Sequence, residues 1–171
     1  NVFVKKSQLD KIFDISINKY TITAIPELSL INNIDLIGKL KNLQTLTLNT
    51  NNVSSLDLTN NVQLKELTVS STGISSLDLT NNVQLKNLTV SGTSISSLDL
   101  TNNAQLKELT VSDTNISSLN LINNAQLKEI TISDTNVSSL DLTKNTQLEE
   151  LYCSSMNIET LDLTTNIKLK N

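Results

Sequence analysis

The sequence predicts a solenoid, a rod of stacked coils that share one long core. One phrase of 21 residues recurs six times, from Leu46 to the last residue, Asn171. Each copy has leucines at fixed offsets, a pattern typical of solenoids with periods of ~20–29 residues. A single copy cannot bury its apolar side chains alone, so neighbouring copies have to stack and share a core. We therefore expect six regular coils over residues 46–171.

Residues 1–45 are less regular and are expected to form an N-terminal cap and irregular repeats. Ser7 is a suitable N-cap for a short helix in which Leu9, Ile12 and Phe13 share one face. Solenoids need capping units with a polar outer face, so this short helix is predicted to close the core. Residues 15–25 then follow the apolar offsets of half a repeat, and Ile37–Leu43 is expected to contain a short helical turn.

Two segments of each regular copy have the alternation of β-strands. In the second copy these are Leu67-Thr68-Val69 and Leu77-Asp78-Leu79, where apolar residues alternate with polar ones. Clusters of Ser, Thr and Asn separate the two segments and favour turns. Stacked copies would pair strand on strand at ~4.8 Å, which gives a rod ~29 Å long. The pattern therefore predicts two narrow parallel sheets, one from each segment.

One asparagine occurs at the same position in all six copies. An amide offers two donors and an acceptor, so it can satisfy backbone groups at an inner turn. We interpret the column as a structural ladder. Its members are Asn61, Asn82, Asn103, Asn124, Asn145 and Asn166.

The spacing of the apolar, asparagine and aspartate positions within a copy resembles the bacterial leucine-rich repeat. Within that repeat it resembles the 21-residue class called IRREKO. The matching positions of the first copy are Leu43, Leu46, Leu48, Asn51, Val53, Leu56, Asp57, Leu58 and Asn61. Cys153 stands where a cysteine variant of that repeat places its thiol, which the resemblance orients inward. The chain departs from the pattern at the first asparagine, which becomes Thr72, Thr93, Thr114, Thr135 and Met156.

This resemblance implies an α/β-type superhelix whose first strand lines a concave face used for protein binding. It also implies a bacterial protein at the cell surface or secreted, similar in general architecture to internalins. The outward strand positions are the expected contact residues: Thr47, Thr68, Thr89, Thr110, Thr131 and Tyr152, with Ser70, Ser91, Ser112 and Ser133 two residues further along. Tyr152 is the best single candidate, because aromatic and arginine anchors are otherwise nearly absent from the repeats.

Composition argues against several other functions. The chain has no histidine, so the commonest general base and metal ligand is missing, and no cofactor is expected. Its net charge is −4 without a cluster of Lys and Arg, which disfavours nucleic-acid binding. It contains no apolar run of the length that spans a membrane. We therefore expect a binding protein and not an enzyme.

Alternative functions remain open for the same columns. The Thr and Ser hydroxyls form a regular lattice that is compatible with binding ice or a repeating glycan. A host-directed effector and a structural spacer are further possibilities.

The aspartate column could bind cations, but each Asp lacks the further oxygen ligands of a Ca²⁺ site. The family resemblance suggests that each Asp bonds to the neighbouring Ser-Ser turn instead. The column consists of Asp57, Asp78, Asp99, Asn120, Asp141 and Asp162.

Two further expectations concern charge and the chain end. Ion pairs between successive copies are expected, because a lysine column lies beside a glutamate column. The columns are Lys65, Lys86, Lys107 and Lys128, and Glu66, Glu108 and Glu129. The last copy ends at Asn171 without a cap, so this edge is expected to continue into further chain or to self-associate.

Overall fold

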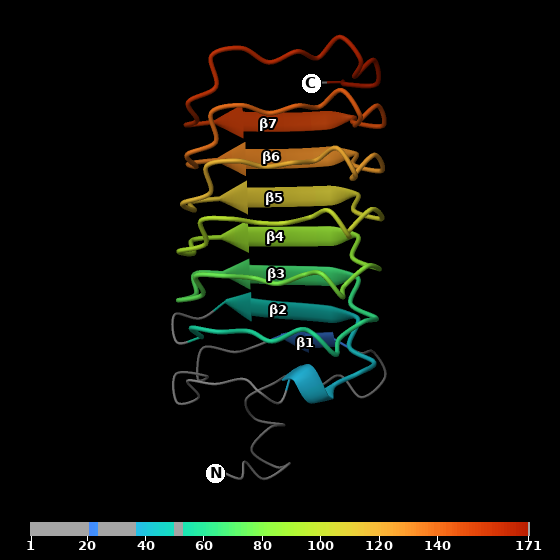
Figure 1. Cartoon of the computed structure of the whole chain (residues 1–171), viewed down its shortest axis with the longest axis vertical. Coiled ribbons are helices and arrows are strands. Elements are labelled where there is room, and N and C mark those ends of the chain that lie inside the picture. The colour runs from blue at the N-terminus through green and yellow to red at the C-terminus, as the bar shows by residue number, and fades with distance from the viewer. Residues whose placement is uncertain (1–20, 24–36, 50–52, 171) are drawn as a thin grey trace.

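The computed structural model describes residues 21–23, 37–49 and 53–170, which form a stack of similar coils (Figure 1). One strand from each coil joins a seven-stranded sheet in the order β1 to β7. All the strands are parallel, and from β2 onward paired residues lie 21 positions apart, as Leu67 and Leu88 do. The predicted leucine-rich-repeat solenoid is confirmed.

Strands β2–β7 have five residues each, and β1 has three. They are β1 (Thr21–Thr23), β2 (Thr45–Asn49), β3 (Glu66–Ser70), β4 (Asn87–Ser91), β5 (Glu108–Ser112), β6 (Glu129–Ser133) and β7 (Glu150–Ser154). The helical turn expected within Ile37–Leu43 is confirmed as a short 3₁₀ helix, η2 (Ile37–Lys39). The helix predicted to begin at Ser7 lies outside the described residues.

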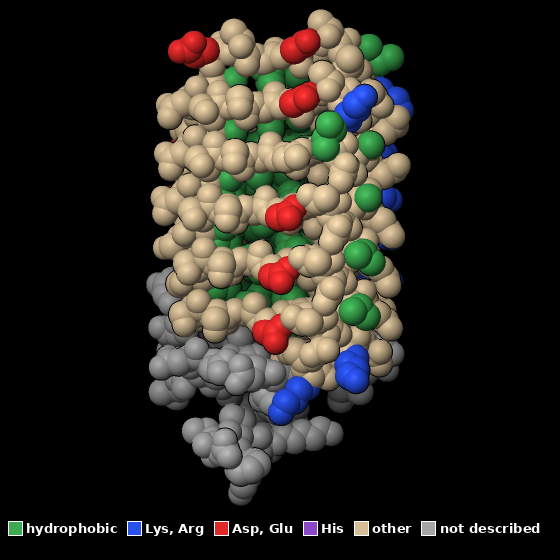
Figure 2. All heavy atoms as spheres, in the orientation of Figure 1, with side chains coloured by type: hydrophobic (Ala, Val, Ile, Leu, Met, Phe, Trp, Pro, Cys, Tyr) green, Lys and Arg blue, Asp and Glu red, His purple; other side chains and the backbone are tan. Residues whose placement is uncertain are grey.

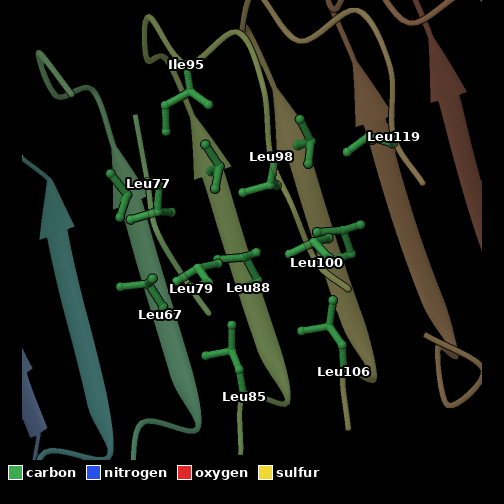
Figure 3. Packing of buried hydrophobic residues seen from close by; sticks show 14 of the residues in the cluster. Leu67, Leu77, Leu79, Leu85, Leu88, Ile95, Leu98, Leu100, Leu106 and Leu119 are labelled. Atoms are coloured by element: carbon green, nitrogen blue, oxygen red, sulfur yellow. The ribbon is translucent and has the colours of Figure 1, made fainter. Parts of the chain in front are cut away.

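The core lies between the sheet and a second segment of each coil, which we call the return segment. In the coil that begins with β4, the return segment runs from Ile95 to Leu100. Strand residues Leu88 and Val90 are buried, and so are Leu98 and Leu100 of the return segment. Figure 3 shows leucines of both sides meeting in layers that repeat from coil to coil. Full burial of one such side chain stabilises the fold by ~1.5–3 kcal/mol.

The chain leaves the sheet through one residue with positive φ after each of five strands. These residues are Ser71 (φ 50°), Gly92 (φ 58°), Asp113 (φ 49°), Asp134 (φ 51°) and Ser155 (φ 50°). The left-handed conformation turns the backbone while hydrogen bonding continues, because the Gly92 amide donates to the Ser112 carbonyl at 3.1 Å. Glycine adopts this conformation without steric cost, and Asp is among the residues that tolerate it.

The asparagine column forms the predicted structural ladder. The side-chain amide of Asn82 donates to the backbone carbonyls of Leu58, at 3.2 Å, and Asn61, at 2.9 Å. Asn103 repeats both bonds one coil later. Each buried amide thus satisfies two carbonyls of the preceding coil, which fixes the stacking distance at this corner.

The second predicted sheet is wrong for the described residues, where the return segments form no strand ladder. The aspartate of these segments, or Asn120 in the segment after β5, explains the difference. The Asp78 carboxylate accepts a hydrogen bond from the Thr80 amide at 2.9 Å, which curls the chain locally. Backbone bonds between return segments are correspondingly few, such as that from the Asn115 amide to the Ile95 carbonyl at 3.0 Å.

The described residues contain no helix with the length and apolar character that a membrane span requires.

Candidate functional site

The threonine positions predicted from the sequence lie in one column on the sheet. We use "sheet face" for the outward side chains of β2–β7. Register pairing places each threonine beside the next and ends the column at Tyr152: Thr47, Thr68, Thr89, Thr110, Thr131 and Tyr152. The five threonines are half-buried, so their hydroxyls remain accessible from one side.

A serine column runs parallel to the threonines along the same face. Its predicted members, Ser70, Ser91, Ser112 and Ser133, are paired in register and half-buried. The Ser112 hydroxyl donates to the Ser91 hydroxyl at 2.8 Å, which links neighbouring coils. The structure therefore brings all the predicted contact residues together on one surface.

The sheet holds these side chains in fixed positions. Between the outward residues of β3, Leu67 and Val69 point into the core and are buried. Each inner strand is also bonded to a strand on both sides. Because the backbone is fixed, binding would cost little conformational entropy at this surface.

A third column at the start of the strands carries most of the charge on the sheet face. It contains Thr45, Glu66, Asn87, Glu108, Glu129 and Glu150. Two of the carboxylates accept hydrogen bonds from a neutral neighbour, Glu66 from Thr45 at 3.2 Å and Glu108 from Asn87 at 2.6 Å. The column is therefore an array of acceptors beside the hydroxyls.

Tyr152 is the most prominent side chain of the sheet face. It is 54% exposed, and its hydroxyl donates to the Glu150 carboxylate at 3.3 Å. It replaces the threonine of the other coils on the same backbone position, paired with Thr131. An exposed aromatic ring with a hydrogen-bonded polar end is typical of residues that anchor interfaces.

Ion pairs between coils occur at Glu149 and at no other acid in the described part of the chain. Glu149 lies 3.1 Å from the Lys128 ammonium and 2.5 Å from that of Lys170. The hydrogen bonds from Lys170 and Lys128 lower the pKa of Glu149 to about 2. The ion pairs expected along the whole lysine and glutamate columns are therefore wrong for the other described coils. There, in-register stacking places lysine beside lysine.

Cys153 lies in the inward column, paired with Ile132, as the repeat pattern implies. It is nevertheless exposed, whereas Ile132 is fully buried. The difference arises because β7 is the last strand of the sheet. Partial burial raises the pKa of the thiol, so it is a poor nucleophile at neutral pH.

The aspartate column lies on the return side of the solenoid. Figure 2 shows acidic side chains following one another along this side, with one interruption. Asn120 occupies that column position in the sequence. The expected bonds to the Ser-Ser turns are wrong, because each carboxylate accepts instead from the backbone amide two residues later.

The hydrogen bonds of these aspartates act on their pKa values. For Asp78, the Thr80 hydroxyl and then its backbone amide lower the pKa of the carboxyl group. Across the described residues, no three His, Cys, Asp or Glu side chains converge as a metal site would require. The column is accounted for by turn formation.

The sequence did not predict the arrangement around Glu129, Glu149 and Glu150. One signal was present, since glutamate replaces lysine at position 149 of an otherwise repeated pattern. Which carboxylates would pair with Lys128 and Lys170 depends on side-chain conformations that the pattern does not specify.

No protein-family model matches the chain, and no curated protein matches it by sequence. Solved structures do resemble it. The functional domain of InlJ from Listeria monocytogenes, described as including a cysteine ladder, has a TM-score of 0.77 and 27% identity. That similarity covers 86% of this chain and 31% of InlJ.

Two other Listeria monocytogenes proteins have a similar fold. The internalin InlF has a TM-score of 0.73 and 23% identity, over 97% of this chain and 48% of that one. Internalin C2 has a TM-score of 0.78 and 21% identity, over 97% of this chain and 72% of internalin C2. The chain thus spans less than half the length of InlJ and of InlF.

Proposed function

Since the chain has the architecture of an internalin-like leucine-rich-repeat solenoid, we propose that it is a non-enzymatic scaffold that binds a protein partner through the sheet face. The observation that carries the proposal is the set of half-buried hydroxyls, with one exposed aromatic, held in register on a seven-stranded sheet. The partner would contact the Thr and Ser columns and Tyr152.

The chemistry of the sheet face supports binding more than catalysis. Its hydroxyls and carboxylates offer many donors and acceptors, but no hydroxyl of this face is paired with a histidine, since the chain has none. Histidine is a common base for activating a hydroxyl nucleophile, and this face does not offer it. A rigid polar surface with an aromatic anchor suits recognition of another macromolecule.

A bacterial cell surface or the extracellular medium is the proposed location. The proposal follows from the likeness to internalins of Listeria. Fractionation of the cells that make the protein tests it, with blotting of surface, secreted and cytosolic pools. Surface or secreted material would support the proposal, and a purely cytosolic pool would contradict it.

Binding through the sheet face is tested with a pair of variants. Thr110→Arg places a large cation in the middle of the sheet face, whereas Ser118→Arg places the same group on the exposed return side. Wild type and both variants would be screened on arrays of extracellular proteins and glycans. A protein hit lost only with Thr110→Arg supports the proposal. A hit restricted to glycans would contradict a protein partner.

A further inference from the structure

The coil of β7 departs from the other coils at two outward positions. Glu149 stands where the four preceding coils have lysine, and Tyr152 stands where β2–β6 have threonine. The preceding copies are nearly identical even at exposed positions, so these differences are local. One change removes a positive charge and the other adds an aromatic ring. Both changes favour the binding of a cation.

The ion pairs around β7 involve only one of the three carboxylates described there. The three carboxylates there are those of Glu129, Glu149 and Glu150, and the two ammonium groups are those of Lys128 and Lys170. Both ammonium groups are within ion-pair distance of Glu149. The pKa of Lys170 is raised mainly by Glu149, and the negative charges of Glu150 and Glu129 add to this effect. In the described chain, however, neither Glu150 nor Glu129 has an ion pair of its own.

The two remaining carboxylates are adjacent. Glu129 of β6 and Glu150 of β7 are paired in register, on the same side of the sheet as Tyr152. Like charges directly opposite each other on neighbouring strands are destabilising. A cation from outside would relieve this repulsion. Glu150 already accepts the Tyr152 hydroxyl at 3.3 Å, so ring and carboxylate are held together.

We infer that Tyr152, Glu150 and Glu129 form a binding site for an arginine side chain of the protein partner. The inference rests on the proposed function, because it names the chemistry that a partner presents to this end of the sheet face. The guanidinium would lie on the exposed Tyr152 ring and donate to the Glu150 carboxylate, with Glu129 one strand away.

Arginine fits the site better than lysine does. Its guanidinium is planar, stacks on aromatic rings and donates to a carboxylate through two parallel bonds. Lysine offers a point charge that is more strongly hydrated. Tyrosine and arginine are also the residues that dominate the energy of protein interfaces.

The other coils lack the combination of groups found at β7. Glu66 and Glu108 each accept a hydrogen bond from the preceding coil, and Lys65 and Lys107 precede them in the chain. Their outward neighbours two residues later are threonines. The site is therefore confined to one end of the sheet face.

The test uses acetylated tetra-arginine amide as the probe and the ring resonances of ¹³C-labelled tyrosine as the readout. The chain has two tyrosines, so the spectrum of Tyr152→Thr identifies the signal of Tyr152. We expect tetra-arginine to shift that signal in a saturable manner. A tetra-citrulline peptide, which keeps the shape without the charge, should leave the signal unchanged.

Matched variants separate this site from general attraction to acidic groups. Glu150→Gln should weaken tetra-arginine binding about tenfold, whereas Glu108→Gln, in the same column, should change it less than about twofold. Transfer of the ring to β4 in a Thr89→Tyr, Tyr152→Thr double variant should weaken the tyrosine shift. On β4 the residue two positions before the ring is Asn87 instead of Glu150, and the nearest carboxylates of this column, Glu66 and Glu108, lie one strand away on either side.

Three results would overturn the inference. They are an equal effect of Glu108→Gln and Glu150→Gln, an equal shift with tetra-citrulline, and full binding by the double variant. If Thr110→Arg abolishes partner binding but tetra-arginine does not bind, only the arginine site is wrong. If tetra-arginine binds as described but Thr110→Arg does not change the binding of a protein partner, the proposed function is wrong.

Discussion

The side-chain amide of Asn103 donates a hydrogen bond to the backbone carbonyl of Asn82, 21 residues earlier, at 3.0 Å. A second bond reaches the Leu79 carbonyl at 3.2 Å. One buried residue thus ties two coils together at the corner between the return segment and the next strand. The same relationship recurs along the rod, so each coil supports its neighbours.

Replacing Asn103 with Leu should lower the free energy of unfolding by ~1–3 kcal/mol, because two buried side-chain hydrogen bonds are lost, while each acceptor carbonyl keeps one backbone donor. Urea denaturation followed by circular dichroism measures the effect. The exposed neighbour Asn102 donates one bond, to Thr80 at 3.3 Å, and Asn102→Ala is the control, with an expected loss of less than ~0.5 kcal/mol. Equal losses for the two variants would contradict the ladder.

Replacing Gly92 with Ala should destabilise the fold by ~1–2 kcal/mol, since an L-residue is strained at its φ of 58°. The new Cβ would also lie 3.4 Å from the Ser71 amide nitrogen. Thermal unfolding measures the change. Gly73 has no positive φ, so Gly73→Ala serves as the control and should be neutral or slightly stabilising. A neutral Gly92→Ala would show that the corner is less constrained than the structure indicates.

The ion pairs of Glu149 should make stability depend on pH. The folded-state pKa of about 2 is below the usual 4.5, so the carboxylate stabilises the fold above pH 4.5. This contribution should decrease as the pH falls from about 4.5 to about 2. Urea midpoints of wild type and Glu149→Gln should therefore differ at pH 6 and converge near pH 2. Glu159→Gln, on the return side, is the control for removal of an exposed carboxylate.

Cys153 should react with a thiol reagent in the folded protein, but more slowly than free cysteine at the same pH. The side chain is exposed, yet its raised pKa leaves less thiolate. Ile132→Cys in a Cys153→Ser background puts a thiol one coil earlier in the same column, where Ile132 is fully buried. That thiol should react at least about tenfold more slowly than Cys153, because access requires local opening. Equal rates would contradict the difference in exposure.

The sequence predicted the solenoid, the first strand of each coil and the asparagine ladder because each depends on local pattern. The alternation in Leu67-Thr68-Val69 determines which side chains face the core, and a fixed 21-residue spacing determines the register. The same reasoning placed all the Thr and Ser contact candidates on one face. These features follow from periodicity alone.

Other features depend on competition between interactions, which periodicity does not describe. Leu77-Asp78-Leu79 alternates as a strand does, but the Asp78 side chain bonds to the Thr80 amide. The choice of Glu149 as the partner of Lys128 and Lys170 depends equally on side-chain conformation. Cys153 has the position that the repeat implies, but its exposure depends on the end of the sheet.

The most direct test of the proposed binding surface is the dissociation constant of an identified protein partner for three forms of the chain. We expect Thr110→Arg to weaken binding by about tenfold or more, equivalent to ~1.4 kcal/mol. Ser118→Arg should leave the dissociation constant within about twofold of wild type, because surface changes away from an interface have small effects. Binding that is weakened by Ser118→Arg and unaffected by Thr110→Arg would place the partner on the return side and contradict the proposal.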